Sequence, residues 1–146
     1  MSGTRLNKAM VLVVDDSRGI LVTARKRLEK LQRGGIIGRC DLCDDGSILL
    51  GLYREAVTTG WRTVIAICDY DMPQLTGIQV IQQLQQIAVE HGWVPPVVCI
   101  ATNGDIEKVV SEWTMAMPDM TPRVFPKDDF VLGDIRVFLE KLLGAS

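Results

Sequence analysis

Short apolar segments alternate with helix-type patterns along the whole chain. The segment Met10–Val14 is apolar throughout, which is typical of a strand that is covered on both faces of a sheet. Further strands are predicted at 36–43, 64–68, 97–100 and 124–125. Strands that are buried on both faces require helices on each side, so this pattern favours a parallel sheet.

The segments between the strands have apolar residues at helical spacing. Ser17 is a suitable N-cap for the first helix, and Gly34–Gly35 is a suitable stop. Further helices are predicted at 48–57, 78–88 and 105–113, and a single last helix carries the stripe Val131, Ile135, Phe138 and Leu142. Five strand–helix units predict an α/β fold, a three-layer (βα)5 sandwich with a five-stranded parallel sheet.

Composition limits the function classes. With 146 residues, 47% of them apolar, the chain is expected to form one domain over 10–146 after a flexible tail at 1–9. The chain has a net charge of −2. It therefore lacks the positive electrostatic field that is typical of nucleic-acid-binding proteins, and no direct binding of nucleic acid is expected. The apolar runs are too short to span a membrane. Four cysteines without an export signal predict a cytoplasmic protein with free thiols.

Acidic residues and one lysine follow the predicted strands. Asp15 and Asp16 follow the first strand, Asp69 and Asp71 follow the third, and Lys127 follows the fifth. In an open parallel sheet these positions meet at the carboxyl edge, where ligands bind. Clustered carboxylates repel one another unless a cation is present, and oxygen ligands select Mg²⁺ or Mn²⁺ over zinc. A metal, a lysine and a carboxylate nucleophile are the parts that phosphoryl transfer to an aspartate needs.

These residues lie in segments that together resemble the receiver domain of two-component response regulators. The segments are Val11–Ser17, Cys68–Pro73 with Gly77, Pro96–Ile100 and Lys127. The resemblance covers about residues 10–143 and implies the flavodoxin-like fold of CheY. It also implies phosphorelay signalling, in which a histidine kinase or a histidine phosphotransfer protein phosphorylates the domain.

The resemblance implies a role for each acidic residue and for the lysine. Asp69 would be the phospho-acceptor and a metal ligand, and Asp16 would bind Mg²⁺ directly. Asp15 would act through water, Asp71 would contribute its backbone carbonyl, and Lys127 would bind the phosphoryl group. The response would be a changed affinity for a partner at the face formed by the fourth helix, fifth strand and fifth helix, and a phosphorylation-dependent homodimer stays open.

The sequence departs from the receiver pattern at three places. Ala101 stands in the slot of the switch hydroxyl, with Thr102 one place later. Val124 stands in the slot of the switch aromatic, with Phe125 beside it. Proline precedes Lys127, where the family has proline after the lysine. A receiver that can be phosphorylated is predicted, with a switch that differs from the usual one.

Two other function classes remain open. One is a pseudo-receiver, an interaction module of the same fold that phosphate does not switch. The other is a small phosphatase, because Asp69 and Asp71 resemble the paired aspartates of haloacid-dehalogenase-type enzymes. That pair follows the third strand here, however, and Pro73 stands where that motif has Thr or Val.

Several residues also have a purely structural interpretation. Asp15 and Asp16 are suitable N-caps, Lys127 resembles an ordinary surface lysine, and Thr102 or Asn103 is a suitable cap for the fourth helix. The pair Cys40 and Cys43 resembles half a zinc site, but His91 is the only histidine and is expected at a helix end. On a strand the two cysteines would point to opposite faces, so we predict free thiols. The apolar cluster before the fifth strand either packs over the core or docks a partner; it comprises Trp113, Met115, Met117 and Met120.

Overall fold

The structure, a computed structural model, describes residues 6–144. Its strands are β1 (Ala9–Val14), β2 (Arg39–Cys43), β3 (Thr63–Asp69), β4 (Val97–Thr102) and β5 (Val124–Pro126). Its helices are α2 (Arg18–Arg33), α3 (Gly46–Thr58), α4 (Gly77–His91), α5 (Ile106–Ala116), α6 (Lys127–Val131) and α7 (Ile135–Gly144). No helix within the described range is long and apolar enough to cross a membrane.

The strands form one parallel sheet in the order β2-β1-β3-β4-β5. Val14 at the end of β1 lies beside Cys43 and Cys68, and Asp69 at the end of β3 lies beside Ala101. The carboxyl ends of the strands therefore meet at one edge, and the predicted α/β sandwich is confirmed.

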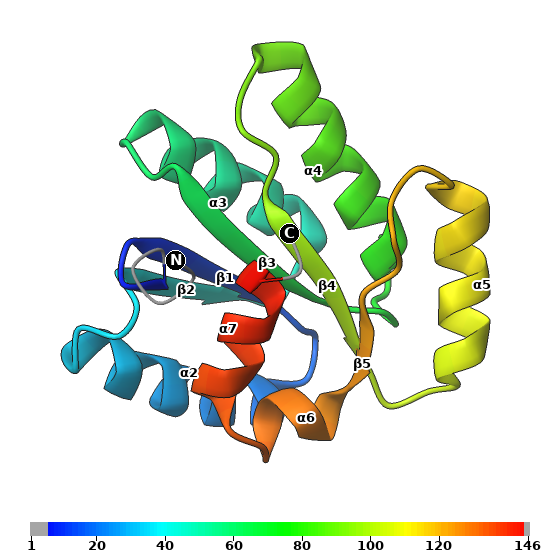
Figure 1. Ribbon diagram of the computed structural model, residues 1–146. Helices are drawn as coiled ribbons and strands as arrows, with labels where there is room; N and C mark the ends of the chain where they lie inside the picture. The colour runs from blue at the N-terminus through cyan, green and yellow to red at the C-terminus, as the bar shows by residue number, and fades with distance from the viewer. Residues whose placement is uncertain (1–5, 145–146) are drawn as a thin grey trace.

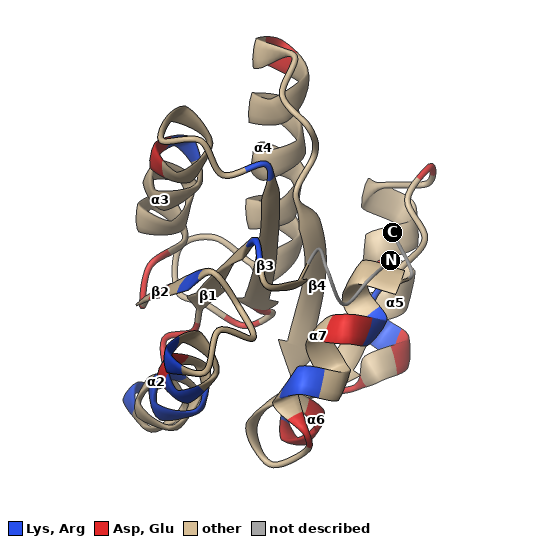
Figure 2. Cartoon of the chain, turned by 60° about the vertical axis from the view of Figure 1, so that its left-hand side comes forward, with Lys and Arg blue, Asp and Glu red and all other residues tan. Residues whose placement is uncertain are grey.

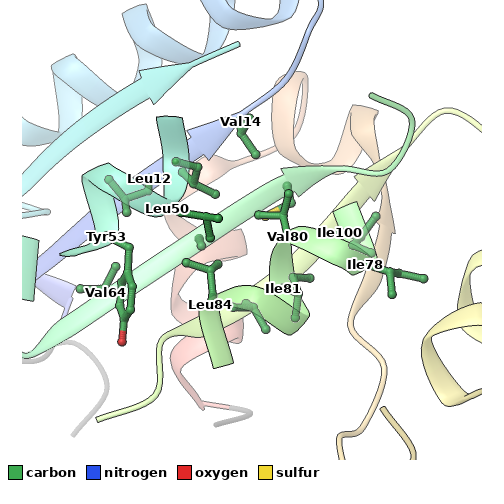
Figure 3. Packing of buried hydrophobic residues seen from close by; sticks show 14 of the residues in the cluster. Leu12, Val14, Leu50, Tyr53, Val64, Ile78, Val80, Ile81, Leu84 and Ile100 are labelled. Carbon is green, nitrogen blue, oxygen red and sulfur yellow. The ribbon is translucent and has the colours of Figure 1, made fainter. Parts of the chain in front are cut away.

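Helices cover both faces of the sheet (Figure 1). The first hydrophobic cluster lies between the sheet and α3, α4 and α5. Figure 3 shows its packing, in which Leu12 of β1 lies near Leu50 of α3 and Ile100 of β4 lies near Ile78 of α4. The second cluster lies between the sheet and α2, α6 and α7. Val11 and Val13 point into the second cluster while Leu12 points into the first, which explains why the strand is apolar at every position.

The predicted caps fix several helix ends. The Ser17 hydroxyl accepts a hydrogen bond from the Ile20 N–H at the start of α2, and Gly34 ends that helix, as predicted. His91 is the last residue of α4, also as predicted, and Gly92 follows in the left-handed conformation with φ 66°, which glycine adopts without strain.

The prediction of a single last helix was wrong, because the chain forms two helices there, α6 and α7. The N–H groups of Leu132 and Gly133 both donate to the Asp128 carbonyl and close α6. Asp134 then accepts a hydrogen bond from the Val137 N–H and starts α7. A glycine followed by an aspartate is a stop followed by an N-cap, and the continuous apolar stripe masked that signal.

The tail expected at 1–9 is only partly described. Residues 1–5 lie outside the described range, whereas Leu6 is buried in the second cluster and Ala9 begins β1. Leu6 and Ala9 thus belong to the core, while Asn7 and Lys8 between them are exposed.

The cysteines are free thiols, and the apolar cluster before β5 packs mainly over the core. Cys40 lies against the second cluster and Cys43 against the first, on opposite faces of β2, and both are free thiols. Trp113 and Met117 are buried in the first cluster, and Met120 packs against it. Only Met115 of this group is strongly exposed, at 86%, so the cluster mainly covers the core.

Candidate functional site

A buried lysine lies between two buried carboxylates at the carboxyl edge of the sheet. The Lys127 Nζ atom is 2.9 Å from Asp15 Oδ2 and 3.0 Å from Asp69 Oδ1. Asp15 and Asp69 are each 4% exposed and Lys127 is 7% exposed. Charges this deeply buried require partners, and these three side chains supply them to one another.

Each of the three side chains is held by its local backbone. Asp15 follows β1, and its Oδ1 accepts a hydrogen bond of 2.8 Å from the Ser17 N–H. Asp69 ends β3, and Lys127 begins α6 directly after β5. The Asp69 backbone is packed against Gly77, where an added Cβ would lie 2.5 Å from the Asp69 carbonyl oxygen. The glycine is therefore required for this close approach.

A third carboxylate completes an acidic cluster. Oxygens of Asp15, Asp16 and Asp69 lie within 4.8 Å of one another, and Asp16 is exposed at the rim. Burial, with a contribution from the Asp15 charge, raises the pKa of Asp69 to about 6 despite the nearby lysine. Burial acts to lower the pKa of Lys127, but its hydrogen bonds to the two carboxylates outweigh this and raise it.

The donor set of this cluster fits a hard divalent cation. It offers carboxylate oxygens from three residues and contains neither sulfur nor imidazole. The pKa of Asp69 is raised by burial and by the neighbouring acid, so a cation would stabilise the charged form of the group. Mg²⁺ and Mn²⁺ prefer such oxygen ligands.

An open pocket of about 420 Å³ adjoins the cluster. It is lined on one side by Asp16, Asp69 and Lys127, and it also includes Asp71 and Thr102. Asp71 is exposed in the loop after β3. The pocket brings together acidic residues, a cation and a hydroxyl around the end of β3.

Thr102, and not Ala101, lines this pocket. Ala101 is buried in the second hydrophobic cluster, on the other face of the sheet. The Thr102 hydroxyl accepts a hydrogen bond of 2.9 Å from the Gly104 N–H. Helix α5 is capped by Asp105, which accepts hydrogen bonds from the N–H groups of Glu107 and Lys108. The cap is therefore neither Thr102 nor Asn103.

The residues of β5 face opposite sides of the sheet. Val124 packs against the first cluster, beside α5. Phe125 faces the second cluster and lies edge-on against Phe138 of α7, with ring centroids 5.2 Å apart. The aromatic ring next to the switch slot thus points away from α5.

Two long-range side-chain contacts could not be seen in the sequence. Arg27 of α2 donates hydrogen bonds to the carbonyls of Phe130, Val131 and Gly133. It belongs to a helix with six basic residues, which appear as the blue bands of α2 in Figure 2. The composition of α2 marks it as basic, but no local pattern distinguishes Arg27 from the other five.

The second long-range contact joins Tyr70 to α5. The Tyr70 hydroxyl donates a hydrogen bond to Glu112 Oε2, 42 residues further along the chain. This hydrogen bond is the main reason why the pKa of Tyr70 is raised to about 12. Tyr70 and Lys108 both line the pocket, and neither was among the predicted site residues.

No family model matches the sequence, and no curated protein matches it. Solved structures do match. A response regulator receiver domain protein from Clostridium thermocellum is 19% identical, with a TM-score of 0.67 over 94% of this chain and 95% of that chain. The chain has the receiver-domain fold.

Two further structures with the receiver-domain fold extend the comparison. The receiver domain of the histidine kinase CKI1 from Arabidopsis thaliana, in a mutant form, is 19% identical, with a TM-score of 0.67 over 94% of this chain and 93% of that chain. The receiver domain of Ssk1 from Saccharomyces cerevisiae is 17% identical, with a TM-score of 0.60 over 82% of this chain and 78% of that chain. That structure is a complex with the histidine phosphotransfer protein Ypd1.

Proposed function

We propose that this chain is a cytoplasmic receiver domain that accepts a phosphoryl group on Asp69 and changes its affinity for a partner. The observation that carries this proposal is the buried Asp69 carboxylate, with Lys127 Nζ at 3.0 Å and two further aspartates beside it, in a receiver-domain fold. The donor is a histidine kinase or a histidine phosphotransfer protein, in keeping with the complex known for the Ssk1 receiver.

The proposed chemistry uses Asp69 as the nucleophile. A carboxylate oxygen of Asp69 attacks the phosphorus of a phosphohistidine, a P–O bond forms, and the P–N bond breaks with its electron pair leaving on the imidazole nitrogen. The reaction requires the ionised carboxylate, which prevails above the pKa of about 6. The Lys127 ammonium, 3.0 Å from the Asp69 carboxylate, would stabilise the negative charge on the transferred group, and such preorganised charge lowers the barrier.

Asp15, Asp16, Asp69 and the backbone carbonyl of Asp71 would hold Mg²⁺ or Mn²⁺. The bound ion would neutralise charge on the phosphoryl oxygens. Asp15 already binds Lys127 through one oxygen and the Ser17 N–H through the other, so its contribution through a water molecule suits the geometry better than direct ligation.

Thr102 is the residue that we propose as the switch hydroxyl. It lines the same pocket as Asp69 and Lys127, whereas Ala101 is buried on the other face of the sheet. Movement of Thr102 toward a phosphoryl group would release its hydrogen bond from Gly104 and alter the loop before α5. The partner surface would be the face of α5, β5 and the α6–α7 segment, and a second copy of the chain is one candidate partner.

The test is an intact-mass measurement after incubation with Mg²⁺ and acetyl phosphate. We expect the wild type to gain one phosphoryl group and Asp69→Ala to gain none. Asp71→Ala is the matched control, because it removes an exposed carboxylate in the same loop and leaves the backbone carbonyl in place. No gain by the wild type, even with a histidine phosphotransfer donor, would overturn the proposal.

The pseudo-receiver remains the second candidate, because Val124 replaces the switch aromatic and Phe125 faces away from α5. It predicts that partner binding is the same with and without the phosphodonor. Turnover of a phosphate monoester, lost in both Asp69→Ala and Asp71→Ala, would instead support the phosphatase alternative.

A further inference from the structure

A single hydrogen bond ties the acceptor loop to helix α5. Tyr70 directly follows Asp69, is half-buried against the first hydrophobic cluster, and donates its hydroxyl to the half-buried Glu112. Tyr70 lines the pocket, and Glu112 lies on α5 one turn beyond the pocket-lining Lys108. The hydrogen bond thus connects the residue directly after the proposed acceptor to helix α5.

The backbone beside Asp69 has little freedom to move. The Gly77 N–H donates to the Tyr70 carbonyl at 2.9 Å, and an added Cβ at Gly77 would lie 2.5 Å from the Asp69 carbonyl oxygen. The loop is therefore fixed against the start of α4. A change of charge at Asp69 would be transmitted by the side chains that line the pocket, not by a shift of this backbone.

Helix α5 presents two charged residues on its pocket side. Lys108 lines the pocket together with Tyr70, and Glu112 follows four residues later, so both lie on one face of the helix. The buried Val109 and Trp113 anchor the same helix in the first cluster. Lys108 is exposed and can move toward a new anion.

Phosphorylation of Asp69 would add an electrostatic attraction between the pocket and helix α5. A phosphoryl group adds a charge of about −1.5 to −2 beside Lys108 and the N-terminal end of α5, and both attract it. The hydrogen bond from Tyr70 to Glu112 would oppose such a movement. Two positions of α5, biased by the charge in the pocket, would make a two-state element.

We propose that the Tyr70–Glu112 hydrogen bond is a latch that holds α5 in its resting position and is released when Asp69 is phosphorylated. This inference rests on the proposed function, because it names the device that connects the acceptor to α5. The latch uses Tyr70 in place of an aromatic residue on β5, where Val124 is aliphatic and Phe125 faces the other layer.

Trp113, one residue after Glu112, can report on the latch. It is completely buried in α5, and the chain has three tryptophans. A background variant with Trp61→Phe and Trp93→Phe leaves Trp113 as the single tryptophan, and cooperative thermal unfolding verifies its fold. Beryllofluoride with Mg²⁺ serves as the phosphoryl mimic in a fluorescence titration, and intact mass with acetyl phosphate measures phosphorylation in the same proteins.

Two variants remove the latch from either side. Tyr70→Phe removes the donor, and Glu112→Ala removes the acceptor while keeping a good helix former. The controls are Tyr53→Phe, which alters the only other tyrosine of the chain, and Glu107→Ala, an exposed acid on the same helix. Both latch variants should start with a Trp113 spectrum shifted toward the beryllofluoride-bound form.

The titration separates the outcomes. If the latch exists, the fluorescence change in both latch variants falls to less than about half, and half-saturation occurs at about fivefold lower beryllofluoride, since coupling between binding and release is reciprocal. The controls keep the background values. Unchanged amplitude and half-saturation in both latch variants would overturn the latch, as would phosphorylation of Asp69 with no change at Trp113. Failure of both the wild type and the background protein to take up a phosphoryl group, from acetyl phosphate and from a histidine phosphotransfer donor, would instead reject the proposed function, and the latch with it.

Discussion

The two sides of the pocket are held in different ways. On the α6 side, Lys127 is buried between Asp15 and Asp69, and Arg27 fixes the end of α6 through three carbonyls. On the α5 side, the loop 103–105 and Lys108 are exposed. Hydrogen bonds at Thr102 and Tyr70 tie that side to the sheet and to the acceptor loop. Regions with few buried contacts open most easily, so the α6 side is suited to hold charges for chemistry and the α5 side to respond.

The lysine should have the largest effect on stability. Lys127→Met leaves Asp15 and Asp69 buried without their cation, and breaking a buried ion pair in this way costs about 3–5 kcal/mol. We expect a loss of this size in urea unfolding at pH 7. The loss should be smaller at pH 5, where Asp69, whose pKa is about 6, is protonated.

Lys108→Met is the matched control on the α5 side. This lysine lines the same pocket but is exposed, so its replacement should change the free energy of unfolding by less than about 0.5 kcal/mol. Similar losses in the two variants would contradict the difference between the two sides.

The arginine on α2 should have the next largest effect. Arg27→Ala leaves the carbonyls at the end of α6 without their charged donor, and a hydrogen bond to a charged group contributes about 1.5–3 kcal/mol. We expect a loss of about 2 kcal/mol in urea unfolding. Arg25→Ala, an exposed arginine on the same helix, should have almost no effect, and an equal loss there would mean that Arg27 does not hold α6.

The meeting of Asp15, Asp69 and Lys127 could be predicted from the sequence. Each follows a short apolar run, and strands of a parallel sheet bring their carboxyl ends together whatever their order. The long-range contacts could not be predicted. Arg27 reaches Gly133 across 106 residues and Tyr70 reaches Glu112 across 42, and no local periodicity encodes a side-chain contact between separate elements.

The placement of Thr102 at the pocket could be predicted only in part. Counting residues from the start of the strand placed Ala101 in the slot of the switch hydroxyl. The alternation of side chains along the strand shows instead which residue faces the pocket. Val98 and Ile100 face the first cluster while Cys99 and Ala101 face the second. Thr102 continues the first set, toward the side where the pocket lies, so the face of the strand predicts this position better than the count.

Replacing the proposed acceptor, Asp69, should have a moderate, pH-dependent effect on the free energy of unfolding. Burial and Asp15 raise the pKa of Asp69 from 3.8 to about 6, so the folded protein binds this proton more tightly than the unfolded chain does. The Asp69 charge therefore costs stability above about pH 6, and the cost disappears as the pH falls toward 4. Without divalent metal, Asp69→Asn should be more stable than wild type at pH 8 by about 1–3 kcal/mol, since each unit of pKa shift corresponds to about 1.4 kcal/mol, and equal to it near pH 4.

Thermal unfolding in EDTA across this pH range measures the difference. Added Mg²⁺ should reduce it, because an ion that binds only the folded wild type stabilises that protein. Asp128→Asn, an exposed acid beside Lys127, should show no such pH dependence. A constant difference between Asp69→Asn and wild type at every pH would show that the Asp69 pKa is not raised in the folded protein.

The smallest effect on stability is expected at Thr102, on the side that we expect to respond. Thr102→Val keeps the shape of the side chain but removes the acceptor of the Gly104 N–H. The exposed loop can replace this bond with water, so the loss in urea unfolding should be only about 0.5–1 kcal/mol. The fluorescence response of Trp113 to beryllofluoride should fall much more, because the hydroxyl that would follow the phosphoryl group is missing. Thr102→Ser, which restores the hydroxyl, should recover the response. A full response in Thr102→Val would show that α5 responds without Thr102, and would leave the charge on Lys108 and the bond from Tyr70 as the remaining connections between the acceptor and the helix.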